Sequence, residues 1–246
     1  MRIAIITDIH ENFQMLEKSH AMLRKHGYDM LVCLGDITGY SPLFYSHTPD
    51  ANACADLLRE HAHIVIAGNH DLHTAARLPS YHIEKNIPAH WYEMSLMERL
   101  KHSREKLWLY EEEVVPELSP ANQRFFAGLR EWAVYENGGE KYLFTHFFRP
   151  DISGISRWFP VTSMEIYAHF RFMKEHGCQL AFTGHAHPPG PTLISWLKWS
   201  NFGYCQVKLR ERHKAVICPA VVGERHPGCC LVFDTTSQTL TPLLVS

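Results

Sequence analysis

The sequence has little excess charge of either sign. Its 24 lysines and arginines nearly balance its 26 aspartates and glutamates, so the formal net charge is −2 at pH 7. Non-specific binding to nucleic acid needs a strongly basic surface. We therefore do not expect nucleic acid as a partner.

Long apolar runs and paired cysteines are also missing. No stretch approaches the roughly 18 apolar residues of a membrane span, and the opening MRIAIITD lacks the apolar core and cleavage site of a signal peptide. The seven cysteines form no C-x-x-C pair and show no paired spacing. These absences predict a soluble, cytoplasmic protein with reduced thiols and no membrane partner.

Histidine, in contrast, is abundant. The chain has 18 histidines, and histidine is both the commonest metal ligand and the side chain that titrates near neutral pH. With 246 residues and 46% hydrophobic content, the chain can build one large domain. We expect some histidines to bind metal.

Strand-like and helix-like segments alternate along the chain, which predicts a layered α/β architecture. The expected strands are residues 2–7, 29–34, 63–67, 132–136, 141–145, 179–182, 214–218 and 229–233. The expected helices are residues 13–26, a segment after Pro49-Asp50, residues 88–113, a segment from Ser119-Pro120, and residues 162–176. We predict a single domain with a helical insertion or cap at about residues 80–130.

Metal-capable side chains follow five of the expected strands. In chain order they are Asp8 and His10, Asp36, Asn69 with His70, His146, and His185 with His187. In open α/β sheets, ligands bind outside the carboxyl ends of the strands, so these clusters can converge on one site.

Each cluster also has a purely structural interpretation. Asp8-Ile9-His10 could cap the helix at Phe13, and Gly35-Asp36 and the stretch Gly68-Asn69-His70-Asp71 could be turns. A lone His146 at a strand end could be structural, whereas His-x-His in a loop bounded by glycine and proline suits chelation. Their joint occurrence at successive strand ends favours a metal site.

In this order and position, the motifs Asp-x-His, Gly-Asp, Gly-Asn-His-Asp, His and Gly-His-x-His resemble those of the calcineurin-like metallophosphoesterases. The resemblance runs from Asp8 to His187 and implies a sandwich of two mixed β-sheets flanked by helices. It implies that one metal is held by Asp8, His10 and His187, that the second is held by Asn69, His146 and His185, and that Asp36 bridges them. His70 would be the proton donor or transition-state stabiliser, and Asp71 would help to orient its loop.

The residue types favour the same chemistry. Mixed carboxylate, imidazole and amide ligands suit Mn²⁺, Fe, Zn²⁺ or Ni²⁺, and two such metals can clamp the attacking and leaving oxygens of an in-line displacement. A hydroxide that bridges the two metals would attack phosphorus, and His70 would protonate the leaving alkoxide. This predicts a dinuclear-metal phosphoesterase.

Some residues depart from the family pattern. Glu11 and Phe147 replace small residues that are frequent there, and we expect them to narrow or recharge the pocket. The stretch from Gly35 to Tyr40 lacks the Asp-Arg-Gly of the family's protein phosphatases and is similar to the small bacterial phosphodiesterase branch. The stretch Cys218-Pro219-Ala220-Val221 stands where those relatives often have Asn-Pro-Gly-Ser.

We therefore expect a small phosphodiester or nucleotide as substrate, with a dinucleoside polyphosphate or cyclic-nucleotide hydrolase as an alternative. A non-catalytic protein-binding scaffold is the alternative from another class, although the presence of His70 argues against it. The aromatic residues of the insertion either stack on a nucleobase or simply pack in the core; they are Trp91, Tyr92, Trp108 and Tyr110. Trp196 and Trp199 could form a substrate wall or a contact in a homo-oligomer.

Overall fold

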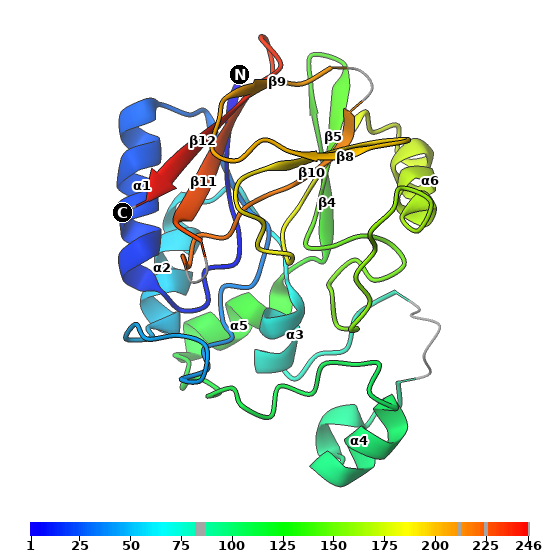
Figure 1. The fold of residues 1–246 in the computed structure, drawn as a ribbon. Coiled ribbons are helices and arrows are strands. Elements are labelled where there is room, and N and C mark those ends of the chain that lie inside the picture. Colours follow the sequence, from blue (N-terminus) through cyan, green and yellow to red (C-terminus); the bar gives the residue numbers. More distant parts are fainter. Residues whose placement is uncertain (82–86, 211–212, 224–225, 246) are drawn as a thin grey trace.

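Two six-stranded sheets form the centre of the protein in a computed structural model that describes residues 1–81, 87–210, 213–223 and 226–245 (Figure 1). The strands of the first sheet, in spatial order, are β3 (Ile64–Val65), β2 (Met30–Cys33), β1 (Arg2–Ile6), β11 (Gly228–Asp234), β12 (Thr239–Val245) and β9 (Val207–Lys208). Those of the second are β4 (Trp132–Asn137), β5 (Glu140–Thr145), β6 (Leu180–Thr183), β10 (His213–Ile217), β7 (Thr192–Ser195) and β8 (Trp199–Asn201). Both sheets mix parallel and antiparallel pairs.

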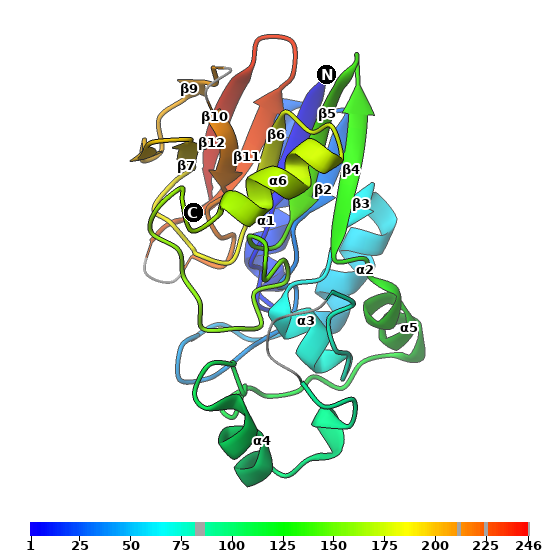
Figure 2. The ribbon, with the colours of Figure 1, turned by 90° about the vertical axis from the view of Figure 1, so that its right-hand side faces the viewer.

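Helices cover the outer faces of this sandwich and one of its ends. The helices are α1 (Phe13–His26), α2 (Ala51–His61), α3 (Asn69–Thr74), the 3-10 turn η1 (Trp91–Glu93), α4 (Leu96–Ser103), α5 (Pro120–Gly128) and α6 (Tyr167–Glu175). Figures 1 and 2 show α1 and α2 outside the first sheet, α6 outside the second, and α3, α4 and α5 at the end of the molecule opposite the N-terminus. The predicted sandwich of two mixed β-sheets flanked by helices is confirmed.

The alternating side chains of the strands build the core on both sides of each sheet. In β1, Ile3 and Ile5 pack between the two sheets, whereas Ala4 and Ile6 pack against the helices of the first sheet. Because both faces of β1 are buried, nearly every residue of the strand is apolar. This explains the apolar run that begins the sequence.

The ends of α1 and α2 follow from local hydrogen bonds. Asn12 caps α1 by accepting a hydrogen bond from the backbone N–H of Met15, and α1 ends before Gly27, whose φ is +88°. Asp50 caps α2, as predicted. The interpretation of Asp8-Ile9-His10 as the cap of α1 is therefore wrong, because Asn12 occupies that position.

The expected helix at residues 88–113 is wrong over most of its length. Helix α4 ends at Ser103, because Arg104 and Glu105 adopt left-handed φ angles. The chain then leaves the helix, and Leu107 and Leu109 are buried while Trp108 between them is only partly buried. Along this segment, burial alternates from one residue to the next and does not follow the period of a helix. Residues 82–86 of the predicted insertion lie outside the described part of the chain.

Helix α6 begins five residues later than the Thr-x-x-Glu motif predicts. The Glu165 carboxylate does accept hydrogen bonds from the backbone N–H and hydroxyl of Thr162 at 2.9 and 2.7 Å. These bonds close a turn, and the helix starts only at Tyr167. Within the described residues, no helix is both long enough and apolar enough to cross a membrane.

Candidate metal centre

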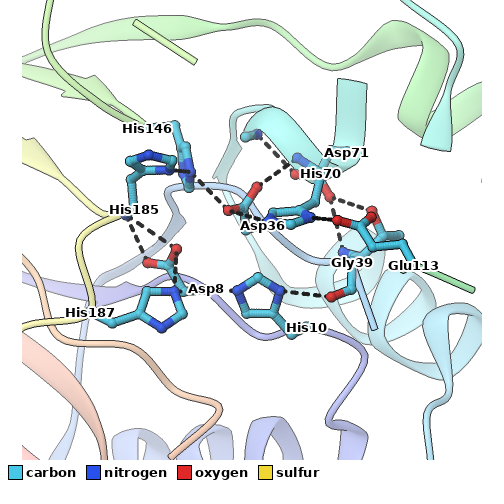
Figure 3. Close-up of polar contacts among 12 residues, drawn as sticks. Asp8, His10, Asp36, Gly39, His70, Asp71, Glu113, His146, His185 and His187 are labelled. Carbon is cyan, nitrogen blue, oxygen red and sulfur yellow. Dashed lines mark hydrogen bonds and ion pairs between the residues drawn. The ribbon is translucent and has the colours of Figure 1, made fainter. Parts of the chain in front are cut away.

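The polar clusters predicted from the sequence lie close together (Figure 3). The loops after β1 and β2 and the start of α3 bring in Asp8, His10, Asp36, Asn69 and His70 from the first sheet. The ends of β5 and β6 bring in the three histidines of the second sheet, His146, His185 and His187. The site therefore lies where the two sheets meet, and neither sheet forms it alone.

Asp8, His10 and His187 form the first group of metal-capable atoms. One ligand atom from each residue lies within 4.8 Å of the others. The His187 Nε2 atom is 3.1 Å from Asp8 Oδ1 and 3.3 Å from His10 Nε2. These are the residues that the family resemblance assigns to the first metal.

Asp36, His146 and His185 form the second group, again with one ligand atom each within 4.8 Å. His146 Nε2 is 3.0 Å from Asp36 Oδ2 and 3.2 Å from His185 Nδ1. Asn69 Oδ1 and His185 Nε2 are buried polar atoms without a hydrogen-bond partner. Because buried polar atoms are normally paired, these two fit a site that is completed by a metal ion.

His70 lies beside Asp36. Its Nε2 atom is 3.8 Å from Asp36 Oδ2, and its backbone N–H donates to Asp36 Oδ1 at 3.0 Å. His10, Asp36 and His70 also satisfy the 4.8 Å grouping. Geometry alone therefore does not separate His70 from the ligands.

Hydrogen bonds to backbone carbonyls orient two of the histidines. The Nδ1 atom of His10 lies 3.1 Å from the carbonyl oxygen of Gly39, and that of His146 lies 2.7 Å from the carbonyl oxygen of Leu34. Since a carbonyl oxygen only accepts, each ring carries its proton on Nδ1. In the neutral ring, this leaves Nε2 as the electron-pair donor that faces the cluster.

The backbone around the site is strained. Left-handed φ angles, between +45° and +67°, occur at five residues of the predicted ligand set, namely Asp8, His10, Asp36, His185 and His187. For residues other than glycine this conformation costs roughly 1–3 kcal/mol each, and such strain is concentrated at functional sites.

Two glycines allow the clusters to approach closely. A Cβ atom on Gly68 would lie 2.1 Å from Asp36 Oδ1, and one on Gly184 would lie 2.1 Å from Thr7 Oγ1 and 2.7 Å from Asp8 Oδ2. The glycines of the Gly-Asn-His-Asp and Gly-His-x-His motifs therefore have a steric role next to the two carboxylates.

Both carboxylates of the cluster are held in the ionised form. Burial alone would raise the pKa of Asp8, but the facing His187 and His146 rings lower it to about 2. Burial likewise opposes ionisation of Asp36, and the His146 and His70 rings lower its pKa well below the usual range. Metals bind the ionised carboxylate.

The imidazole rings of the cluster differ in the direction of their pKa shifts. Burial, together with repulsion from nearby rings, lowers the pKa of His10 and of His185 to about 3 each, so both are neutral and able to bind metal. Burial also opposes the charged form of His146 and His70, but attraction by Asp36 raises the pKa of each to about 9.

Asp71 joins the loop after β2 to the start of α3. Its Oδ1 atom accepts from the backbone N–H groups of Ile37 and Thr38, and its Oδ2 atom accepts from that of Gly68. Because these bonds connect the segments that carry Asp36 and Asn69, Asp71 orients the loop.

The expectation that Glu11 and Phe147 narrow the pocket is wrong. Glu11 is buried and accepts from the backbone N–H groups of Gly39 and Tyr40, each at 3.2 Å. Phe147 is buried behind the His185 ring, with the ring centres 4.5 Å apart. Neither side chain is among the described residues that line the cleft, so neither narrows it.

The loop that contains Ala220 supports the first cluster from behind. The backbone N–H groups of Val221 and Val222 donate to the carbonyl oxygens of Thr7 and Asp8 at 3.0 and 3.1 Å. Ala220 itself lines the cleft. The stretch that departs from the family's Asn-Pro-Gly-Ser pattern thus fixes the backbone that carries Asp8.

A cleft of about 970 Å³ opens above the clusters. Of the aromatic residues in the predicted insertion, Trp108 and Tyr110 line this cleft, whereas Trp91 is buried in the core and Tyr92 packs against it. The packing interpretation therefore holds for two of the four. Trp196 and Trp199 are not among the described residues that line the cleft, so a substrate wall at that place is not supported.

Two residues of the cleft have no signal in the sequence. Glu113 contacts His70, with 2.5 Å between Oε1 and Nδ1. Arg157 lies with its guanidinium 4.8 Å from the centre of the Trp108 ring. Glu113 lies in the irregular segment between α4 and α5, and Arg157 lies in the one between β5 and α6. No motif or periodicity marks either as a functional residue.

Comparison with known proteins places this geometry in a family. A 69-residue segment is 35% identical to the uncharacterized protein MJ0912 of Methanocaldococcus jannaschii, a match that spans 28% of this chain and only 26% of that relative. The fold resembles the crystal structure of a metallophosphoesterase from Sphaerobacter thermophilus, with a TM-score of 0.67 at 21% identity over the whole chain and 88% of that protein.

The fold also resembles the hypothetical protein PH1004 of Pyrococcus horikoshii OT3, with a TM-score of 0.59 and 14% identity, again over the whole chain and 88% of that protein. Identities this low indicate a shared fold only. The family assignment comes from the sequence, because residues 1–189 match the model of the calcineurin-like phosphoesterase family. The chain therefore belongs to the calcineurin-like phosphoesterase family.

Proposed function

We propose that this protein hydrolyses a small phosphate ester, a phosphodiester or a nucleotide, with two divalent metal ions. The observation that carries the proposal is the pair of adjacent histidine and aspartate groups at the base of one open cleft. Asp8, His10 and His187 would hold the first metal. Asn69, His146 and His185 would hold the second, with Asp36 between the two.

The donor set suggests which metals would bind. Imidazole nitrogens, carboxylates and one amide oxygen suit Mn²⁺, Fe, Zn²⁺ or Ni²⁺ better than an all-oxygen site for Mg²⁺ or Ca²⁺. When bound, two such ions would polarise the phosphate and activate water for in-line attack. The neutral rings of His10 and His185 are ready to bind without losing a proton.

His70 supplies the proton that the leaving oxygen needs. The ring lines the cleft beside Asp36, and Asp36 and Glu113 overcome the effect of burial and raise its pKa to about 9. A protonated imidazole at this place can donate from Nε2 to an alkoxide as it leaves phosphorus.

The upper part of the cleft suits a substrate with a ring and a charged group. Arg157 lines it and is stacked on Trp108, and no ion pair of Arg157 occurs in the described ranges. Phe159 is 46% exposed and stacks on His185 with an angle of 16° between the rings. A guanidinium can bind a phosphate oxygen, and an aromatic face can stack on a base.

Arg157 also favours a second candidate, a dinucleoside polyphosphate or cyclic-nucleotide hydrolase. A cation in the cleft in addition to the metal-capable clusters could bind a phosphate other than the one that is cleaved. A non-catalytic scaffold, in contrast, has no use for a charged His70 in an open cleft.

A substrate panel tests the proposal. The purified protein is loaded with Mn²⁺ and assayed with a chromogenic phosphodiester, the matching monoester, a dinucleoside polyphosphate and a cyclic nucleotide, before and after chelation. The proposal predicts hydrolysis of at least one ester that stops on chelation. Hydrolysis that is insensitive to chelation, or no hydrolysis by the metal-loaded protein, would contradict it.

A further inference from the structure

A carboxylate from a distant part of the chain contacts the proposed proton donor. Glu113 Oε1 lies 2.5 Å from His70 Nδ1, and the Glu113 side chain is 9% exposed (Figure 3). The two residues are 43 positions apart, so the contact exists only because the chain after α4 folds back over the start of α3.

Backbone hydrogen bonds fix Glu113 in this place. Its own N–H donates to the carbonyl oxygen of Tyr110 at 3.3 Å, and the N–H of Val114 donates to that of Tyr40 at 3.0 Å. The Tyr110 ring packs edge-on against His70, with ring centres 5.2 Å apart. The same short segment thus supplies both the carboxylate and a wall for the imidazole.

Gly39 leaves the space that Glu113 uses. A Cβ atom on Gly39 would lie 2.4 Å from His70 Nδ1, and the φ of Gly39 is +99°, a conformation that other residues rarely adopt. The loop after β2 therefore presents no side chain beside this nitrogen. A carboxylate that pairs with Nδ1 has to come from another part of the chain.

The contact determines what the other ring nitrogen can do. With Glu113 Oε1 beside Nδ1, the ring lies with Nε2 toward Asp36 Oδ2, 3.8 Å away. Glu113 is in none of the metal-capable groups found among the described residues. Its contact is with His70 and not with the proposed metal ligands.

We infer that Glu113 is a positioning residue, which accepts the Nδ1 proton of His70 and aims Nε2 at the leaving oxygen of the substrate. The inference rests on the proposed function. In the step, the Nε2 proton passes to the leaving oxygen, the N–H bond breaks as an O–H bond forms, and the imidazole becomes neutral while it keeps its Nδ1 proton. Glu113 remains a carboxylate throughout.

Kinetics of three variants test this role. Glu113→Gln keeps the size of the side chain but removes its charge, and Glu113→Asp keeps the charge on a shorter chain. Glu117→Gln is the matched control, because Glu117 is exposed and lies in the same segment outside the cleft. We expect Glu113→Gln to lower kcat by roughly 10- to 100-fold with KM within about twofold, Glu113→Asp to recover part of the loss, and Glu117→Gln to match the wild type.

The imidazole itself provides a second measurement that needs neither metal nor substrate. In metal-free protein labelled with ¹⁵N-histidine, the Nδ1 proton signal of His70 is assigned by its loss in His70→Ala. We expect this signal to persist in Glu117→Gln and to shift or disappear in Glu113→Gln. A purely structural role for Glu113 would leave metal-loaded kcat unchanged once the protein is folded.

Either of two results would overturn the inference: a kcat of Glu113→Gln within about twofold of the control, or an unchanged Nδ1 signal in that variant. If the wild type hydrolyses no ester, the proposed function fails, and with it the catalytic part of this inference. The proton signal then still decides whether Glu113 holds the His70 ring.

Discussion

His146 and Asp36 follow strands of different sheets, yet their side chains meet with 3.0 Å between Nε2 and Oδ2. A second contact joins the same two segments, because His146 Nδ1 contacts the backbone carbonyl oxygen of Leu34 at the end of β2. The packing of the two sheets thus sets the distance between the proposed ligands. A metal bound there would stabilise the sandwich as well as serve catalysis.

Replacing the proton donor should separate catalysis from metal binding. We expect His70→Ala to lower turnover by roughly 100-fold or more, the usual scale of general acid catalysis, while metal content stays nearly unchanged. Steady-state kinetics and elemental analysis check this. His90→Ala is the control, because His90 is exposed; equal activity of the two variants would remove His70 from the mechanism.

Adding a methyl group at Gly68 should displace Asp36, because the new Cβ atom would lie 2.1 Å from Asp36 Oδ1. We expect Gly68→Ala to destabilise the fold by about 1–3 kcal/mol and to weaken metal binding. Gly128→Ala is the matched control, because no atom lies within 4 Å of its added Cβ. In urea unfolding, Gly128→Ala should be as stable as the wild type or up to about 1 kcal/mol more stable. Similar losses of stability in Gly68→Ala and Gly128→Ala would refute the steric argument.

Removing the positive charge of Arg157 should weaken substrate binding. Arg157→Met keeps an apolar side chain on Trp108 but loses the charge, so we expect KM to rise by roughly tenfold or more for a substrate with a second phosphate. Arg124→Met, an exposed change on α5, should leave KM unchanged. The same small effect on every substrate would show that Arg157 contacts no phosphate.

His169 should make stability depend on pH away from the metal centre. Burial and nearby Arg149 lower its pKa from 6.5 to about 3, so below pH 6.5 the unfolded chain takes up a proton that the folded chain does not. Its contribution is therefore fully present above pH 6.5 and is lost as the pH falls toward 3. Between pH 7.5 and 5.5, the wild type should lose about 1 kcal/mol more stability than His169→Gln in urea unfolding.

An exposed histidine provides the comparison for that experiment. His26 lies at the exposed end of α1, and His26→Gln should lose as much stability as the wild type over the same pH range. The metal centre is common to all three proteins, so its own pH dependence cancels in the difference. If His169→Gln shows the same pH dependence as the wild type, the buried ring is not the cause.

The parts of the fold with strong local signals were predictable. The hairpin of β4 and β5 matches the expected strands 132–136 and 141–145, between which Asn137-Gly138-Gly139 favours a tight turn. The strand ends at Asp8 and Asp36 marked the cluster, because turn chemistry and buried strands are encoded locally. The extended chain at Leu107 was not predictable in this way. Its burial depends on partners such as Ile155, whose carbonyl oxygen accepts from Trp108, and a local pattern contains no such information.

The site, like the fold, was predictable only where local motifs mark its residues. Motifs near strand ends indicated the metal-capable residues, but Glu113 and Arg157 reach the cleft through long-range folding of segments without motifs. The sequence also could not show that Glu11 turns away from the cleft to hold the backbone of Gly39. Residues that act through such contacts are visible only in three dimensions.

The most direct test of the account is the number of metals per chain. Protein loaded with Mn²⁺ or Zn²⁺ and freed of excess metal is measured by elemental analysis, beside Asp8→Ala and His185→Ala, which each remove one residue from a different group. The account predicts two metals in the wild type and one in each variant. One metal or none in the wild type, or two metals in both variants, would contradict it.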